Sequence, residues 1–272
     1  MGGPTRRVYR RPGAGGDGGA RDDRPLCPGM AARRGEGVTR MKVARQVASI
    51  VLALSVFVAL PALSVAVGFQ FLGPWFVARE YAQPGFPPAE RYQPAERLAL
   101  SQETVRWLVA PNGAEGLRQM ESSAGPVYNA REVGHLVDVM KLLGVIRGLA
   151  AAAGAICLVA LGVALARPAL RRPVARSAFW GSAALLAVLA VILLGALTSF
   201  DTFFVGFHEA LFPPDTWVFD FSDSLIQFYP VQFWMDFFYQ LGALFVVEAL
   251  VVAGAALLYL RKAAGRRRGV RA

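Results

Sequence analysis

Four long apolar stretches constrain the fold of this chain more than any other feature. They run at about 47–67, 149–166, 178–197 and 237–260. A helix needs about 20 mostly apolar residues to cross the hydrocarbon core of a bilayer. Each stretch is close to that length, and 55% of the 272 residues are hydrophobic. The sequence therefore predicts an all-α integral membrane protein with four transmembrane helices, and it excludes an ordinary soluble domain.

The sign of the charge changes from one connecting segment to the next. Residues 1–45 carry 11 basic and 4 acidic residues, residues 167–176 carry four arginines, and residues 261–272 carry six basic residues. In contrast, residues 200–239 hold six acidic residues and no lysine or arginine. Because lysine and arginine are retained on the cytoplasmic side, we expect both termini in the cytoplasm. The net charge of +10 then reflects topology and contact with anionic lipid, and we expect no nucleic-acid partner.

This topology gives two extracytoplasmic loops, at about 71–147 and 200–236. The first loop is large, and residues 95–109 and 131–147 are expected to be helical within it. Both have apolar residues at helical spacing, and the second should continue directly into the second span.

The expected domain organisation has three parts. Residues 1–40, rich in glycine, arginine, aspartate and proline, are expected to form a disordered basic tail. Residues 41–265 form the membrane domain, and residues 266–272 form a basic cytoplasmic tail. The first span is interpreted as a retained helix rather than a cleaved signal peptide.

The segment 200–239 is the most unusual part of the chain. It contains 15 of the 30 aromatic residues and lies between two spans, which is typical of a segment at the outer membrane interface. It also contains His208, one of only two histidines. The other, His135, lies in the first outer loop, so we expect the two loops to meet and form one extracytoplasmic site.

Two histidines suit proton transfer near neutral pH. Asp138 lies three residues after His135, on the same helix face, and could orient its imidazole; Glu132 lies three residues before it. The sequence contains no GxSxG or HExxH motif. A catalyst of this kind would therefore depend on acid–base chemistry, with the substrate supplying the nucleophile.

Other interpretations remain open from the residues alone. The histidines could be interfacial polar groups, or ligands in a non-enzymatic haem or metal protein. Outer loops that bind a partner would make this an assembly protein and both histidines dispensable. Glu248, near the middle of the fourth span, is interpreted as structural. The aspartates that could join the histidines in a metal site are Asp215, Asp220, Asp223 and Asp236.

The two histidine-containing segments together resemble a known family. REVGHLVDVMK (131–141) and FHEALFPPDTWVFDFSDSLIQFYPVQFWMDF (207–237), on four spans with a large first outer loop, resemble the bacterial lipoprotein intramolecular transacylases. The resemblance covers about residues 41–261. It departs from the family pattern at Phe221, where a proline is expected after Asp220.

The resemblance implies a reaction and a set of site residues. The substrate would be a lipoprotein whose N-terminal cysteine carries an S-linked diacylglyceryl group. Its sn-2 acyl chain would move to the cysteine α-amine and give a lyso-form lipoprotein, at the extracytoplasmic side of the bacterial cell membrane and without a cofactor. His135 and His208 would be the acid–base residues. The residues expected to position the substrate or support the site are Arg131, Glu132, Asp138, Phe207, Trp217, Asp220 and Asp223.

Overall fold

The computed structural model describes residues 28–269, and the chain divides into two units, residues 1–45 and 46–272. The predicted disorder of residues 1–27 lies outside the described part. Residues 28–45 form the first part of helix α1 (Pro28–Val67). The expectation of disorder therefore differs from the structure at 28–40. Once the apolar part of a helix has formed, each preceding residue adds one hydrogen bond, so a helix extends readily through alanine, methionine, arginine and glutamate.

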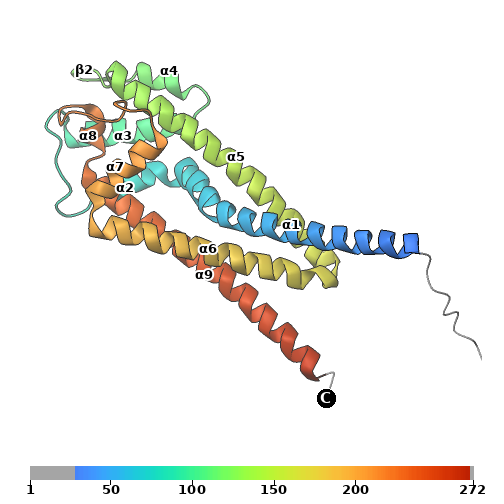
Figure 1. Cartoon of the computed structure of the whole chain (residues 1–272). Helices are drawn as coiled ribbons and strands as arrows, with labels where there is room; N and C mark the ends of the chain where they lie inside the picture. The colour runs from blue at the N-terminus through green and yellow to red at the C-terminus, as the bar shows by residue number, and fades with distance from the viewer. Residues whose placement is uncertain (1–27, 270–272) are drawn as a thin grey trace, which may run out of the picture. The chain divides into compact units, whose positions relative to one another are not determined.

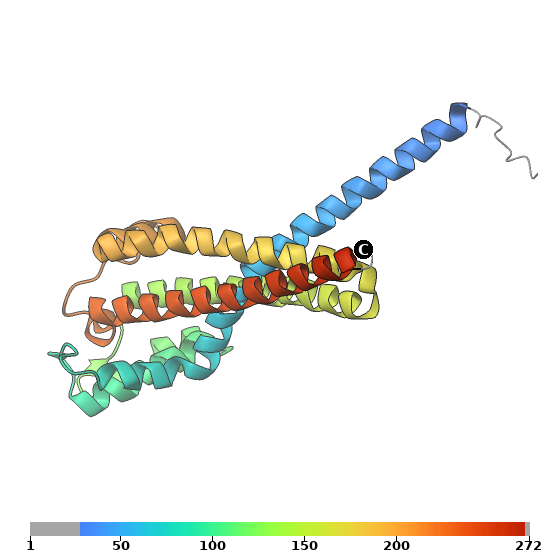
Figure 2. The same ribbon diagram turned by 90° about the horizontal axis from the view of Figure 1, so that it is seen from below.

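The second unit contains the four predicted spans, each within a long helix. They are α1, α5 (Ala130–Ala166), α6 (Arg171–Thr198) and α9 (Val231–Gly269). Over the described residues, four helices are long and apolar enough to cross a membrane. This confirms the prediction of four apolar spans. Figure 1 and Figure 2 show α6 running alongside α9.

Close contacts hold the second half of α1 against the other long helices. A Cβ at Gly181 of α6 would come within 2.3 Å of the Ala53 carbonyl oxygen of α1, so this crossing requires glycine. Further along the same face of α6, Leu185 and Leu189 pack with Ala249 of α9. Small residues at helix crossings allow the close packing that membrane helices depend on.

The connecting segments gather at one end of this unit (Figure 1). After α1, a π-helical turn (η1, Gly68–Leu72) leads into α2 (Gly73–Tyr81). The segment expected as the first extracytoplasmic loop then forms α3 (Pro94–Val109), α4 (Gly113–Arg118) and a short antiparallel pair, β1 (Glu121–Ser122) and β2 (Gly125–Pro126). The helix expected at 95–109 is confirmed, and so is the helix at 131–147, which runs straight into the second span as α5.

The segment expected as a loop at 200–236 is largely helical. It contains α7 (Phe200–Leu211) and α8 (Ser224–Phe228), and α9 begins at Val231. Ser199 caps α7, because its side chain accepts a hydrogen bond from the Thr202 backbone. At the opposite end, a 3₁₀ turn (η2, Pro168–Leu170) joins α5 to α6. The arginine-rich segment 167–176 therefore lies at the end of these helices away from α3, α4, α7 and α8 (Figure 1).

The short helices at this end share one apolar core, which fixes the position of the site. Phe228 of α8 and Val77 of α2 are fully buried, and Leu117 of α4 is 1% exposed. Tyrosine hydroxyls form hydrogen bonds across this core: Tyr229 donates to the Ser101 carbonyl oxygen of α3 at 2.7 Å. Because buried tyrosine hydroxyls need such partners, these bonds favour one arrangement of the short helices.

Candidate active site

The structure brings His135 of α5 and His208 of α7 together. Their ring centroids lie 5.9 Å apart, and the rings are stacked with an interplanar angle of 29°. The two residues are only 9% and 8% exposed. They are 73 positions apart in the sequence, so the pair exists only because α5 and α7 lie next to each other.

Aromatic side chains enclose both imidazoles. Phe212 lies 4.8 Å and Phe219 5.5 Å from the His135 ring, and Trp217 lies 5.0 Å from the His208 ring. Phe207 contacts His208 edge-on at 5.4 Å. Residues 212–219 follow α7, so the segment after this helix covers the pair. The enclosure is apolar and excludes most of the water around the histidines.

The hydrogen bond of His208 defines its tautomer. Nδ1 lies 2.7 Å from the carbonyl oxygen of Phe204, one turn earlier in α7. A carbonyl oxygen can only accept, so Nδ1 carries the proton and Nε2 of the neutral ring keeps its lone pair. Burial lowers the pKa of His208 below its usual value, and the Phe204 carbonyl opposes this with a smaller effect. His208 is therefore a neutral imidazole with a free basic nitrogen.

Two buried nitrogens beside the pair lack hydrogen-bond partners within the described part of the chain. They are Nδ1 of His135 and Nε1 of Trp217. An unpaired buried polar group costs about 1–3 kcal/mol, so such groups are uncommon in folded proteins unless a ligand satisfies them. These two nitrogens are positions where a substrate could accept or donate a hydrogen bond.

Asp138 does not contact His135 in the expected way. It accepts a hydrogen bond from Lys141 at 2.8 Å, and among the described residues no hydrogen bond links it to His135. The helix brings both to adjacent positions, but an ammonium three residues further along α5 competes successfully for the carboxylate. The expected orienting hydrogen bond is therefore not formed in this structure.

Glu132 stabilises the start of α5 and its contact with α8. It is 1% exposed and forms a capping box with Asn129 at the start of α5. Its other oxygen accepts a hydrogen bond from the Leu225 backbone at 2.8 Å. Glu132 thus links the start of α5 to α8.

Arg131 and two aspartates form a latch on the segment that covers the histidines. Arg131 contacts Asp223 at 2.9 Å and Asp220 at 3.2 Å, and its guanidinium lies 5.5 Å from the Phe219 ring. Asn129 also donates to Asp223, at 2.8 Å. The latch holds Phe219 against His135.

Some residues of this site were not singled out by sequence reasoning. They are Phe204, Phe212 and Phe219. Phe204, His208 and Phe212 are spaced four apart, the spacing that places side chains on one face of a helix, and this signal could have identified two of them.

Among residues 28–269, no group of three or more histidine, cysteine, aspartate or glutamate side chains is arranged to hold a metal ion. Asp215 is exposed, and Asp220 and Asp223 pair with Arg131.

These observations define a four-span membrane protein with a buried, aromatic-enclosed histidine pair at one end. The family model described as lipoprotein intramolecular transacylase Lit matches residues 50–234, which is more than half of the chain. The chain therefore belongs to this family, and it is a multi-pass membrane acyltransferase.

Individual proteins are similar to this chain over most of its length. An uncharacterized protein of Aquifex aeolicus (strain VF5) is 27% identical over 195 residues, covering 68% of this chain and 80% of that protein. A solved structure of the membrane integral transacylase Lit from Bacillus cereus has a TM-score of 0.60 and 16% identity, covering 84% of this chain and 99% of that chain. A variant of the same protein with one histidine replaced by arginine has a TM-score of 0.59 and 17% identity, covering 85% and 98%. These structures share the fold.

Proposed function

We propose that this protein moves the sn-2 acyl chain of a diacylglyceryl-modified bacterial lipoprotein to the α-amine of the same N-terminal cysteine. The observation that carries the proposal is the buried pair of His135 and His208, with a free basic nitrogen on His208. Membership of the transacylase family supports acyl transfer over the haem or metal interpretation.

The proposed reaction balances without a cofactor or an enzyme nucleophile. The amine nitrogen attacks the ester carbonyl carbon, a C–N bond forms and the nitrogen loses a proton. The bond from that carbon to the glycerol oxygen then breaks, and the oxygen takes up a proton. The products are an amide and a glycerol hydroxyl. Because amine and ester belong to one molecule, the protein contributes mainly orientation and proton transfer.

The environment of each side chain suggests its role. His208 Nε2 takes the proton from the attacking amine, because Nδ1 is already committed to Phe204. His135 accompanies it as the second proton-transfer group, and its unpaired Nδ1 is satisfied by the bound substrate. The Trp217 indole N–H donates to the carbonyl oxygen as negative charge develops there. The aromatic enclosure accommodates the acyl chain.

The latch residues act indirectly in this proposal. Arg131, Asp220 and Asp223 hold the covering segment, and Glu132 holds α5 against α8. Phe207 borders the acyl chain next to His208. Asp138 raises the local negative charge near His135 without a direct hydrogen bond.

Mass spectrometry of a defined lipoprotein N-terminus tests the proposal, in a host that lacks other N-acylating enzymes. With the unsubstituted chain, we expect two acyl chains, one of them on the amine. His135→Ala and His208→Ala should leave both chains on the glycerol, since losing a general acid or base costs about 10²–10⁴-fold in rate. Persistence of the diacylglyceryl form with all three proteins would reject this function.

We also propose that the site faces the extracytoplasmic side and that both termini lie in the cytoplasm. The arrangement of the basic segment 167–176 and the acidic segment 200–239 at opposite ends supports this orientation. Single cysteines test it in a cysteine-free background. Phe221→Cys, at a side chain 88% exposed, should react with a membrane-impermeant maleimide on intact cells, whereas Ala169→Cys should react only after lysis. The reverse pattern would overturn the orientation.

A further inference from the structure

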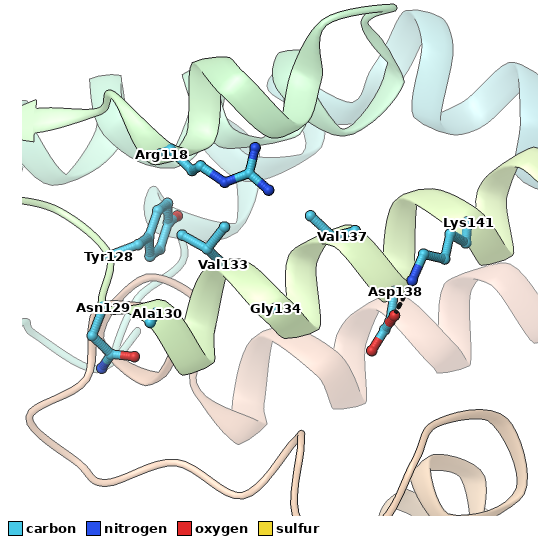
Figure 3. Close-up of a pocket in the computed structure, with 9 residues that line it drawn as sticks. All are labelled: Arg118, Tyr128, Asn129, Ala130, Val133, Gly134, Val137, Asp138 and Lys141. Carbon is cyan, nitrogen blue, oxygen red and sulfur yellow. Dashed lines mark hydrogen bonds and ion pairs between the residues drawn. The ribbon is translucent and has the colours of Figure 1, made fainter.

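A groove of about 550 Å³ lies between α4 and the first turns of α5, and no role has been assigned to it (Figure 3). Its volume is within the roughly 300–1,000 Å³ typical of ligand sites. The α5 residues that line it recur every three or four positions, so they form one face of the helix. The side chain of His135, the next residue, projects about 100° away from Gly134 around the helix axis, and His135 does not line the groove. The residues that line the groove are Arg118, Tyr128, Asn129, Ala130, Val133, Gly134, Val137, Asp138 and Lys141.

Gly134 leaves the floor of this groove open to close approach by a ligand. Glycine inside a helix is less favourable than alanine, so it normally has a packing reason. Within the described structure, a Cβ at Gly134 would meet no atom within 4 Å. The packing of this chain therefore does not require glycine here. Its lack of a side chain leaves the α5 backbone open to close approach from the groove.

The rim carries polar groups of both signs. Arg118 reaches from α4 towards Val133 and Val137 of α5 (Figure 3). It also lies 3.6 Å from Glu115, and Lys141 pairs with Asp138 at 2.8 Å. Each cationic side chain is thus paired with a carboxylate, so the groove does not favour the binding of a polyanion. Polar donors and acceptors above an apolar floor suit an extended polypeptide.

The groove adjoins the histidine pair through α5. Asp138 lines the groove and lies one turn from His135. From Ala130 to Lys141 the helix rises roughly 16 Å, which matches about five extended residues. A lipoprotein whose lipidated cysteine lies at the histidines must direct the rest of its chain away from them and towards water.

We infer that this groove binds the first residues of the lipoprotein polypeptide, as an extended segment that follows the lipidated cysteine. The inference deepens the proposed function and rests on it for the identity of the substrate. The groove then contributes affinity for the polypeptide, while the aromatic enclosure takes the lipid.

Peptide length and a groove-filling substitution test this role. The substrates are synthetic diacylglyceryl-cysteine peptides with two or eight residues after the cysteine. Gly134→Leu should lower the ratio of kcat/KM for the long peptide over the short one by about tenfold, through a higher KM for the long peptide. Gly144→Leu is the matched control: Gly144 is also in α5, is exposed and has no atom within 4 Å among the described residues, but it does not line the groove. Its ratio should equal that of the unsubstituted protein.

Photo-crosslinking gives a readout that does not depend on turnover. The eight-residue peptide carries benzophenone at its fourth residue, and the attachment point is mapped by mass spectrometry. Crosslinks to α4 or the first turns of α5, lost with Gly134→Leu and kept with Gly134→Ala, support the groove. An unchanged kcat/KM ratio with Gly134→Leu, or crosslinks elsewhere, would overturn it. Crosslinks at the groove without acyl transfer would leave the groove standing and reject the proposed function.

Discussion

His208 is the residue whose chemistry the structure defines most fully. Its Nδ1 donates to the Phe204 carbonyl oxygen at 2.7 Å, and its side chain is buried between Trp217 and Phe212. The sequence predicted that a histidine at this position would transfer protons. It could not predict which nitrogen is free, because that depends on the helical geometry of α7 and on the aromatic side chains packed around the ring.

The lowered pKa of His208 predicts how the imidazole itself titrates. Burial keeps the imidazole neutral at pH values where an exposed histidine, with a pKa of about 6.5, would be protonated. The basic form therefore persists below that pH, and an NMR titration of the His208 ring should show protonation only at pH values below about 6.5. The same shift makes the folded state lose stability as pH falls from about 6.5 towards the pKa of the folded protein, because the unfolded chain binds the proton first. A His208 ring that takes up its proton at or above pH 6.5 would contradict this assignment.

Trp217 gives a second prediction at the residue scale. Trp217→Phe keeps an aromatic ring beside His208 and removes an indole N–H that has no partner among the described residues. If that N–H stabilises the developing oxyanion, kcat should fall about tenfold or more with little change in KM. Trp75→Phe, at a side chain 58% exposed on α2, is the control and should leave both values unchanged. An unchanged kcat for Trp217→Phe would exclude the role.

At the scale of elements, the site depends on how α5 and the segment after α7 are joined. Arg131 and Asn129, at the start of α5, hold Asp223, and this keeps residues 212–219 over the histidines. The helical pattern of α5 was predictable from its apolar spacing. The helix α7 was not, because its aromatic residues suited a membrane interface equally well, and its end is set by packing.

The two aspartates of the latch should differ in importance. Asp223 is 12% exposed and accepts hydrogen bonds from Asn129, Arg131 and the Asp220 backbone, whereas Asp220 is 80% exposed and accepts one long contact from Arg131. Asp223→Ala should lower kcat/KM about tenfold and increase proteolysis of residues 212–223, because Asn129, Arg131 and the Asp220 backbone lose their shared acceptor at once. Asp220→Ala should change kcat/KM less than about twofold, as for exposed ion pairs. Equal losses for both variants would reject this view of the latch.

At the scale of the whole molecule, a polar contact within the membrane links the first and last long helices. Ser64 of α1 donates to Glu248 of α9 at 2.5 Å. The sequence placed a carboxyl group near the middle of the fourth span and suggested a structural role. It could not identify the partner, since the two residues are 184 positions apart. The contact lies on the membrane part of the protein, away from the histidines.

Removing this contact should destabilise the protein without altering its chemistry. Ser64→Ala should lower the free energy of unfolding by about 1 kcal/mol, because the carboxyl group loses its donor inside the membrane. Ser182→Ala is the control: its hydroxyl is fully buried and has no partner in the described structure, so its loss should be close to neutral. Unfolding in mixed micelles measures both, and kcat of the folded protein should not change. Equal stability of the two variants would mean that the Ser64–Glu248 contact contributes nothing.

The sequence by itself determined the class of protein and where its parts lie. Hydropathy fixes four membrane helices, because a bilayer requires each backbone polar group to be satisfied within its own helix. The spacing of apolar residues determines α3 and the N-terminal half of α5. The two histidine segments also indicated the family, since their residues are local in the sequence.

Only the tertiary structure decided how the site works. Four features depend on tertiary contacts: the approach of His135 to His208, the tautomer of His208, the pairing of Asp138 with Lys141 and the groove beside Gly134. Most of these partners are far apart in the chain or compete with a nearby alternative. Local patterns specify helices, whereas packing selects which polar groups meet and which remain free for a substrate.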